Sequence, residues 1–431
     1  MSEEIFVWIY FALFIVMILL EVPIGSAMVL SSLLYIVQNG QSFVMFAQKT
    51  ATSFASYSLL AVPAFVFVGC AMNEIGFSDR IFGVAEKVVG HIPGGLGHAN
   101  VLASMIFAGM SGSAMADAGG LGAIEIKAMD DAGYDRGFSV AITAASSGIG
   151  PIIPPSINLV VWGFLAGAST IELFMAGIVP GVLMGLCLML YIYIAVTRFH
   201  VQAPTTPRAT FREFLRALWR GLPALGAPII LLGGVSSGVF TSTETGSVAC
   251  AYIILLGLCY RRLSGKTMLT ILKNTMSTTA MTMWLCATGS VFNWMIINSG
   301  LTARLSSLLL DIPSKVAVLL LLNLMLLFMG CFMGCFMGSL PVLIMMAPVL
   351  LNIADAFSMS YVTMGVMAVL NLTIGLITPP MAPALFVAAK TANVPFEQAL
   401  KHTLPMIVPL VAALLMVTFI PAVTLLLPGL M

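Results

Sequence analysis

The sequence predicts an all-α, polytopic membrane protein whose two halves form an inverted repeat, each with one re-entrant helical hairpin and one broken helix. Its composition, an internal repeat and helix-breaking residues inside apolar runs predict this fold. Of the 431 residues, 60% are hydrophobic and 8% are charged, whereas a soluble domain carries about 25% charged residues. The chain therefore has the composition of a protein whose solvent is the lipid bilayer.

The charged residues are segregated and leave long apolar runs between them. The charge-free runs cover 5–20, 22–48, 50–73, 137–171, 173–197, 221–243, 274–303, 316–354, 356–389 and 403–431. A helix that crosses the bilayer needs about 20 apolar residues, so the longest runs must fold back or break inside the membrane. The net charge of +1 excludes a nucleic-acid-binding surface. The seven cysteines show no metal-ligand spacing.

A polar, arginine-rich segment at 198–220 divides the chain near its midpoint. A second basic cluster, 261–273, follows after enough apolar residues for two spans, so both clusters lie on one face. The positive-inside rule assigns that face to the cytoplasm and the acidic amino terminus to the outside. We therefore predict a first repeat at 1–197, a basic cytoplasmic linker and a second repeat at 221–431. The first apolar run lacks a basic leader and is predicted to be a span, not a signal peptide.

The repeat is visible as three short motifs that recur in the same order. The matches, at offsets of 225, 225 and 224 residues, are GPIIPP at 150 with GLITPP at 375, GMSGS at 109 with GCFMG at 334, and GFSDR at 76 with GLTAR at 300. The two halves begin on opposite faces under the charge assignment above. This is what an inverted repeat requires.

Each half is predicted to contain a hairpin followed by a broken helix. The first hairpin covers about 98–129 and the first broken helix about 138–168; their counterparts cover about 316–354 and 362–391. Non-helical backbone at membrane depth must line a protected cavity, and broken helices expose main-chain dipoles that bind ions and carboxylates. This arrangement is typical of secondary transporters. The glycines at 330, 334 and 338 also fit close helix packing alone.

The candidate site residues lie at the hairpin tips and at the helix breaks. The ion-binding and tip candidates are Ser111, Gly112, Ser113, Asp117, Gly334, Gly338 and Ser339. The broken-helix candidates for substrate or ion are Gly150, Pro154, Pro155, Ser156, Asn158, Asn371, Gly375, Thr378, Pro379 and Pro380. The two asparagines could instead satisfy freed backbone groups. Lys390 is a weak cationic candidate for binding an anion.

Four acidic residues in or beside apolar segments receive separate interpretations. Asp117 could hold an ion or cap the second hairpin arm, because ionisable residues inside membranes are functional candidates. Glu125 is predicted to form an interfacial pair with Lys127. Glu244 is predicted to cap the helix that follows it, and Glu21 is interpreted as its counterpart in the first half.

Several long stretches resemble one known family. SGSAMADAGGLGAIEIKAMDDAGYDRGFSVAITAASSGIGPIIPPSI and NLTIGLITPPMAPALFVAAKTANVP resemble the DctM-type large membrane subunit of tripartite ATP-independent periplasmic (TRAP) transporters. The resemblance runs from about Leu59 to the carboxyl end. Departures from the family pattern fall at Gly338-Ser339, where the family often has Asp after Phe-Met, and at Ala382-Pro383-Ala384.

The resemblance implies a function, partners and a mechanism. It implies a multi-pass protein of the bacterial inner membrane that is not an enzyme. Such a protein couples the entry of Na⁺, the one metal expected, to the import of an organic acid such as a C4-dicarboxylate or sialic acid. The implied partners are a small four-helix membrane subunit and a periplasmic substrate-binding protein. The implied mechanism is an elevator-type movement, with hairpin tips at Ser111–Ala114 and Gly334–Pro341.

Other functions fit the sequence less well. The nearest alternative is a stand-alone Na⁺/carboxylate symporter without a binding protein. A proton-channel-like respiratory subunit would need charged residues in the middle of its helices, and the longest runs have none there. An ATP-driven pump is disfavoured because the GKT at 265–267 has Tyr260 where a phosphate loop needs glycine. A channel would leave the paired helix breaks unexplained.

Overall fold

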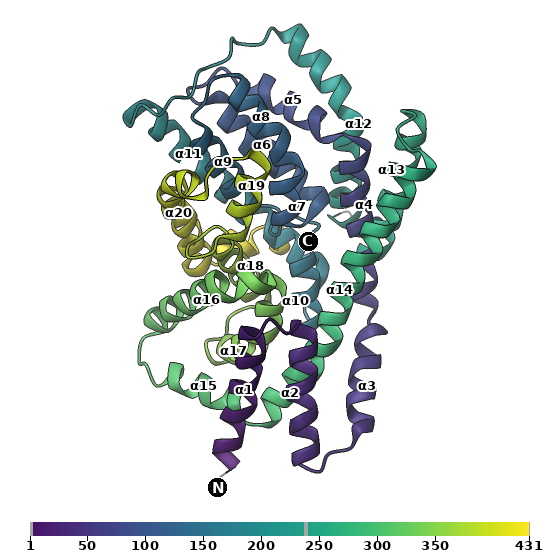
Figure 1. The fold of residues 1–431 in the computed structure, drawn as a ribbon, viewed down its shortest axis with the longest axis vertical. Helices are drawn as coiled ribbons and strands as arrows, with labels where there is room; N and C mark the ends of the chain where they lie inside the picture. Colours follow the sequence, from purple (N-terminus) through teal and green to yellow (C-terminus); the bar gives the residue numbers. More distant parts are fainter. Residues whose placement is uncertain (1–2, 237–239, 431) are drawn as a thin grey trace.

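A computed structural model describes residues 3–236 and 240–430 (Figure 1). The described residues form helices joined by short loops, with no β-strand. The first half contains α1 (Glu3–Leu19), α2 (Ile24–Gln38), α3 (Phe43–Phe54), η1 (Tyr57–Leu60), α4 (Ala61–Ile75), α5 (Ser78–Val89), α6 (Gly95–Ser111), α7 (Ala114–Gly119), α8 (Leu121–Asp131), α9 (Arg136–Ser147), α10 (Ile157–Ala166) and α11 (Thr170–Arg198).

The second half also contains a helical hairpin followed by a broken helix. It contains α12 (Phe211–Ser236), α13 (Ser242–Cys259), α14 (Gly265–Asn298), α15 (Leu301–Leu310), α16 (Lys315–Met337), α17 (Ser339–Ala356), α18 (Tyr361–Gly375), α19 (Pro383–Ala392), α20 (Phe396–Phe419), α21 (Ala422–Leu425) and η2 (Pro428–Leu430). Within the described residues, eight helices are long and apolar enough to cross a membrane, and shorter apolar helices accompany them. The protein is therefore a multi-pass, all-helical membrane protein.

The halves pack against each other reciprocally. Helix α2 packs on α14 of the other half, and α13 packs on α4. Helix α10 packs on α17, while α19 packs on α7 and α8. Helix α11 contacts α18, and α20 contacts α9. Each of these contacts has an equivalent in which the two halves trade roles. Two similar halves related by an approximate two-fold axis produce such pairs of contacts, so the packing supports the predicted repeat.

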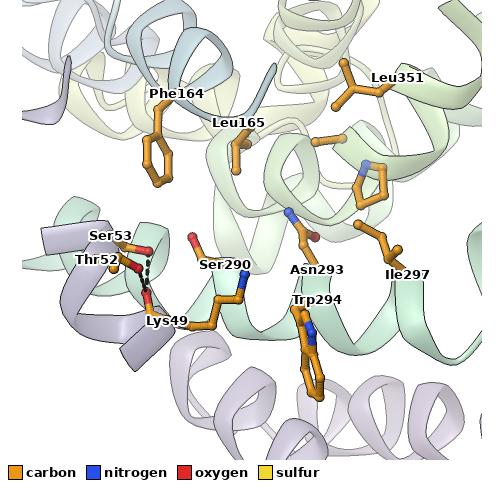
Figure 2. Close-up of a pocket in the computed structure, with 12 residues that line it drawn as sticks. Lys49, Thr52, Ser53, Phe164, Leu165, Ser290, Asn293, Trp294, Ile297 and Leu351 are labelled. Atoms are coloured by element: carbon orange, nitrogen blue, oxygen red, sulfur yellow. Dashed lines mark hydrogen bonds between the residues drawn. The ribbon is translucent and has the colours of Figure 1, made fainter. Parts of the chain in front are cut away.

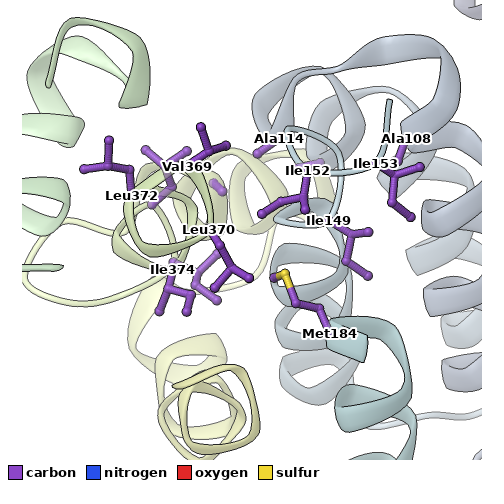
Figure 3. Close-up of a cluster of buried hydrophobic side chains, with 14 of the residues drawn as sticks. Ala108, Ala114, Ile149, Ile152, Ile153, Met184, Val369, Leu370, Leu372 and Ile374 are labelled. Carbon is purple, nitrogen blue, oxygen red and sulfur yellow. The ribbon is translucent and has the colours of Figure 1, made fainter. Parts of the chain in front are cut away.

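The first segments of the two broken helices form the centre of the protein. In α9 and in α18 every residue after the first is buried. Figure 3 shows the side chains of Ile149 and Ile152, just after α9, in one apolar cluster with Leu370 and Ile374 of α18. Burial from all sides holds these segments in place, so the breaks that follow them have fixed positions.

The predicted linker is shorter in the structure than in the sequence interpretation. Helix α11 continues to Arg198 and α12 already begins at Phe211, so residues 199–210 connect them and 211–220 are helical. The backbone N–H of Thr210 donates to Oε2 of Glu213 at 2.8 Å, which satisfies an N–H at the helix start. The exposed arginines at 212, 216 and 220 are four residues apart and therefore lie on one face of a helix. The sequence interpretation had assigned these arginines to the linker.

The predicted helix cap at Glu244 is confirmed. Glu244 and Thr241 form a reciprocal capping box at the start of α13, in which each side chain accepts a backbone N–H of the other residue. The interpretation of Glu21 as the equivalent cap is wrong. Helix α2 begins after Pro23 with no side-chain cap, and Glu21 adopts a φ of 61° in the preceding turn.

Candidate functional site

A cavity of about 190 Å³ lies where the two hairpin tips meet the helix breaks. Its lining comes from both tips (Gly112–Met115 and Gly338–Pro341), from the two breaks (Pro151, Ile157, Asn158 and Leu376) and from α14 (Thr278, Thr282 and Leu285). Segments from both halves of the chain thus converge on one space. Five predicted site residues line it: Gly112, Ser113, Asn158, Gly338 and Ser339.

The first hairpin tip is packed closely against the first break. Gly112 ends α6 with a φ of 60°, a left-handed conformation that favours glycine. A Cβ atom at this position would lie 2.7 Å from the carbonyl oxygen of Pro155. Both the turn and the close approach therefore require glycine. Ser113 then adopts an extended conformation, and α7 begins. Ser111 ends α6, but its side chain lies outside the described residues.

The second hairpin tip depends on glycine for a different reason. Gly338 has a φ of 73° and a ψ of 179°, and it links α16 directly to α17. No atom lies within 4 Å of the position that a Cβ would take. Here glycine supplies the backbone conformation, and it leaves space on the cavity side.

The first break is bridged by hydrogen bonds of one serine side chain. Proline at 151, 154 and 155 removes three amide donors between α9 and α10. Ser156 precedes α10, accepts the backbone N–H of Leu159 at 3.2 Å and donates to the carbonyl of Pro151. Two residues on, Asn158 donates from Nδ2 to Oγ of Ser339 at 2.9 Å. The break is thereby joined to the opposite hairpin tip.

The second break is held by packing between glycines and by a threonine. A Cβ on Gly375 would lie 2.7 Å from Cα of Gly330, so α18 and α16 touch at their backbones. Thr378 donates to the carbonyl of Ile374 at 2.6 Å, whereas Pro380 is exposed. The glycine series in α16 therefore serves both predicted purposes, since Gly330 packs against α18 and Gly338 forms the turn.

The cavity has a neutral lining between converging helix ends. No residue that lines it is charged in the described part of the chain. Helices α10 and α17 begin at the cavity, and α6 and α16 end beside it. Helix amino termini present N–H groups and partial positive charge, and carboxyl termini present carbonyls and partial negative charge. The space can therefore hold an anion and a small cation without ionised side chains.

Asp117 lies behind the cavity and touches the first break. Its side chain is 2% exposed. A Cβ on Gly150 would lie 2.5 Å from Oδ2 of Asp117. The carboxylate therefore rests directly on the glycine that begins the GPIIPP motif, and the position of the break and of this acid depend on each other.

The predicted interfacial pair of Glu125 with Lys127 is wrong. Glu125 is 1% exposed, on the same hairpin arm as the buried Asp117, while Lys127 is exposed. Residues two positions apart in a helix point in different directions, so α8 turns one inwards and the other outwards. Glu125 was thus missed as a buried acid. Its position inside an otherwise apolar stretch, where an ionisable residue is a functional candidate, is the signal that could have found it.

Asn371 lies outside the cavity, in a buried polar network. Its Nδ2 donates to the carbonyl oxygen and to Oδ1 of Asn323, at 2.9 and 2.8 Å. In the first half, Ser146 Oγ donates to Oδ1 of Asn100 at 2.7 Å. Asn323 follows Asn100 by 223 residues, and Asn371 follows Ser146 by 225. Equivalent contacts thus join each hairpin to its broken helix.

The remaining candidates do not reach the cavity lining. Gly334 of α16 packs against Leu376, the first residue after α18, and Pro379-Pro380 follow Leu376 in the second break. Lys390 is exposed in the last turn of α19. In contrast, Thr278 and Thr282 of α14 line the cavity and were not predicted. Threonines at a four-residue spacing in a long apolar helix are the signal that could have found them.

Comparison with known proteins decides the family. Residues 11–423 match the family model described as the DctM component of the tripartite ATP-independent periplasmic transporter. This chain belongs to the DctM family. As a DctM component it is a multi-pass inner-membrane permease subunit of TRAP transporters and not an enzyme.

Individual DctM relatives match over nearly all of the chain. The sialic acid TRAP transporter large permease protein SiaM of Vibrio cholerae is 40% identical over 95% of both chains. The sialic acid TRAP transporter permease protein SiaT of Haemophilus influenzae is 38% identical over 99% of this chain and 68% of that protein. Among solved structures, the Alcanivorax borkumensis YdaH transporter shares the fold, with a TM-score of 0.62, 14% identity and 86% coverage of each chain.

Proposed function

We propose that this DctM component is the large transmembrane subunit of a Na⁺-coupled, binding-protein-dependent secondary transporter that imports an organic acid. The observation that carries the proposal is the neutral cavity at which four helix ends converge. The names of the relatives in Vibrio and Haemophilus make sialic acid the first candidate substrate. The partners in this proposal are a small membrane subunit and a periplasmic substrate-binding protein.

The substrate carboxylate is bound by main-chain groups in this proposal. The amino termini of α10 and α17 present backbone N–H groups to the cavity, and Ser113 and Asn158 add polar side chains. No cationic side chain lines the cavity in the described residues. Burial of an uncompensated charge is costly, so a Na⁺ ion bound beside the carboxylate supplies the missing positive charge. Carbonyl oxygens at the ends of α6 and α16, with the hydroxyls of Ser113 and Ser339, are suitable ligands for it.

The cavity lies at a boundary between two groups of helices, which supports an elevator-type movement. Most of its lining comes from the hairpins and breaks, and α14 closes the remaining side. Helix α14 packs mainly with α2, α3 and α4. In this proposal the hairpins and broken helices carry the substrate past α14, which stays fixed.

Uptake into vesicles tests this proposal. Vesicles with this chain and its small partner should accumulate radiolabelled sialic acid only with an inward Na⁺ gradient and the loaded binding protein. Accumulation without the binding protein would favour the stand-alone symporter. Accumulation that is indifferent to Na⁺ would overturn the coupling. If a binding protein loaded with other acids supports uptake and sialic acid does not, the class holds and the first candidate substrate is wrong.

A further inference from the structure

A second cavity, of about 350 Å³, lies between α3 and α14 on one side and α10 and α17 on the other (Figure 2). Figure 2 shows the side chain of Lys49 extending from α3 towards Ser290 and Asn293 of α14. This volume is in the range of small-molecule sites. The cavity is separate from the central one, with which it shares no lining residue.

The hydroxyls of Thr52, Ser53 and Ser290 donate to backbone carbonyls of their own helices, so the polar groups of interest in this cavity are those of Lys49 and Asn293. Lys49 is the one charged residue among those that line it, and none of the ion pairs within the described residues involves it. Asn293 is 8% exposed, and its Oδ1 has no hydrogen-bond partner among the described residues. A buried acceptor without a partner is unfavourable. The site thus offers a cation for an anion and an acceptor for an N–H or O–H donor.

The two cavities follow each other along the same three helices. Helix α10 contributes Asn158 to the central cavity and Leu165 to the second one. Helix α17 likewise contributes Ser339 to the central cavity and Ala347 to the second one, and α14 lines both cavities. A rise of about 1.5 Å per residue separates these levels by about 10 to 12 Å. The second cavity lies towards the Asn298 end of α14, on the side of the amino terminus (Figure 1).

We propose that the second cavity is a binding station for the organic acid on its path between the amino-terminal face and the central cavity. The substrate carboxylate accepts from Nζ of Lys49, and a hydroxyl or amide N–H of the substrate donates to Oδ1 of Asn293. The ligand class is therefore a carboxylate that also carries hydroxyl or acylamino groups. This inference rests on the proposed function, because it assigns a further subsite to the same solute.

Three variants of the complete transporter, with one control, test whether the second cavity binds the substrate. With the small subunit and the loaded binding protein in vesicles, Lys49→Gln should lower the initial rate of sialic acid uptake about tenfold. Lys49→Arg should restore most of it, since it keeps the charge. Asn293→Ala should lower the rate about fivefold. It removes an acceptor that has no partner, so the fold should tolerate it. The matched control is Lys266→Gln, an exposed lysine at the opposite end of α14, which should leave the rate unchanged.

Trp294 gives a second measurement, because it lines the same cavity. Sialic acid added to the purified complex should change the tryptophan fluorescence, and Trp294→Phe or Lys49→Gln should remove this change. If Lys49→Gln showed normal uptake and an unaltered fluorescence response, the second cavity would not be a binding site for the substrate. The proposed function would still stand. A Lys49→Gln defect seen only in vesicles that contain phosphatidylglycerol would also overturn this binding site, because the occupant would then be a lipid phosphate. If the unaltered complex takes up no organic acid, both proposals fail.

Discussion

Asn158 donates a hydrogen bond from Nδ2 to Oγ of Ser339 at 2.9 Å, across 181 residues of sequence. Asn158 belongs to the first turn of α10, after the first break, and Ser339 begins α17, at the second hairpin tip. Both side chains are more than nine-tenths buried, and both line the central cavity. The two halves of the chain are therefore joined by a polar contact at the point where a solute would bind.

Asn158→Ala should lower Na⁺-driven uptake about tenfold, which corresponds to about 1.4 kcal/mol. The substitution removes a polar group from the cavity and leaves the Ser339 hydroxyl without this donor. Initial rates in vesicles measure the effect. A double-mutant cycle with Ser339→Ala separates the contact from the two individual side chains.

The cycle has a definite expected result. The loss in Asn158→Ala/Ser339→Ala should be clearly smaller than the product of the two single losses, because either substitution alone breaks the hydrogen bond. Losses that multiply would show that the two residues act independently. Asn371→Ala is the matched control, since it removes a buried asparagine outside the cavity and should reduce thermal stability more than substrate affinity.

The sequence predicted the tips and breaks because their causes are local. Gly112 and Gly338 are needed for turns, and the double prolines remove donors wherever they stand. The inward direction of Glu125 and the partners of Asn371 depend on how helices pack, which a single sequence does not specify. Thr278 and Thr282 were missed for the same reason, since only the packing of α14 against the tips brings them to the cavity.

Gly338→Ala should impair transport through the backbone of the second tip. With φ at 73° and ψ at 179°, this residue lies in a region that is essentially restricted to glycine. The strain should cost about 1 to 3 kcal/mol and should distort the tip rather than clash, because the space around it is open. Thermal unfolding and uptake measure the two effects.

The control for this variant is Gly40→Ala, in the loop between α2 and α3. Gly40 also has a positive φ, of 59°, and open space around it, but it lies far from the cavity. Its replacement should also strain the backbone, at a cost of about 1 to 2 kcal/mol, but should leave uptake unchanged. Equal loss of uptake in both variants would show that the tip has no special part in transport.

Glu125→Gln should be tolerated or should raise the thermal stability of the protein. Glu125 and Asp117 are both buried, and burial together with a negative charge on Asp117 opposes ionisation of Glu125. Two nearby carboxylates in an apolar interior do not both remain ionised readily, and glutamine keeps the shape without the charge. Thermal unfolding in detergent measures the effect. Lys127→Gln should change nothing. A clear destabilisation by both variants would restore the surface-pair interpretation.

Gly150→Ala should weaken the binding of the coupling Na⁺ by displacing Asp117 or the first break. The new Cβ would lie 2.5 Å from Oδ2 of Asp117, so either the carboxylate or the first break must move. If that acid helps to hold the coupling ion, the Na⁺ concentration for half-maximal uptake should rise about tenfold, equivalent to about 1.4 kcal/mol of binding.

Gly83→Ala is the matched control, since this glycine of α5 has no atom within 4 Å of the added Cβ. It should keep uptake normal and add up to about 1 kcal/mol of stability. An unchanged Na⁺ dependence in folded Gly150→Ala would remove Asp117 from the ion site and leave it a structural acid beneath the break.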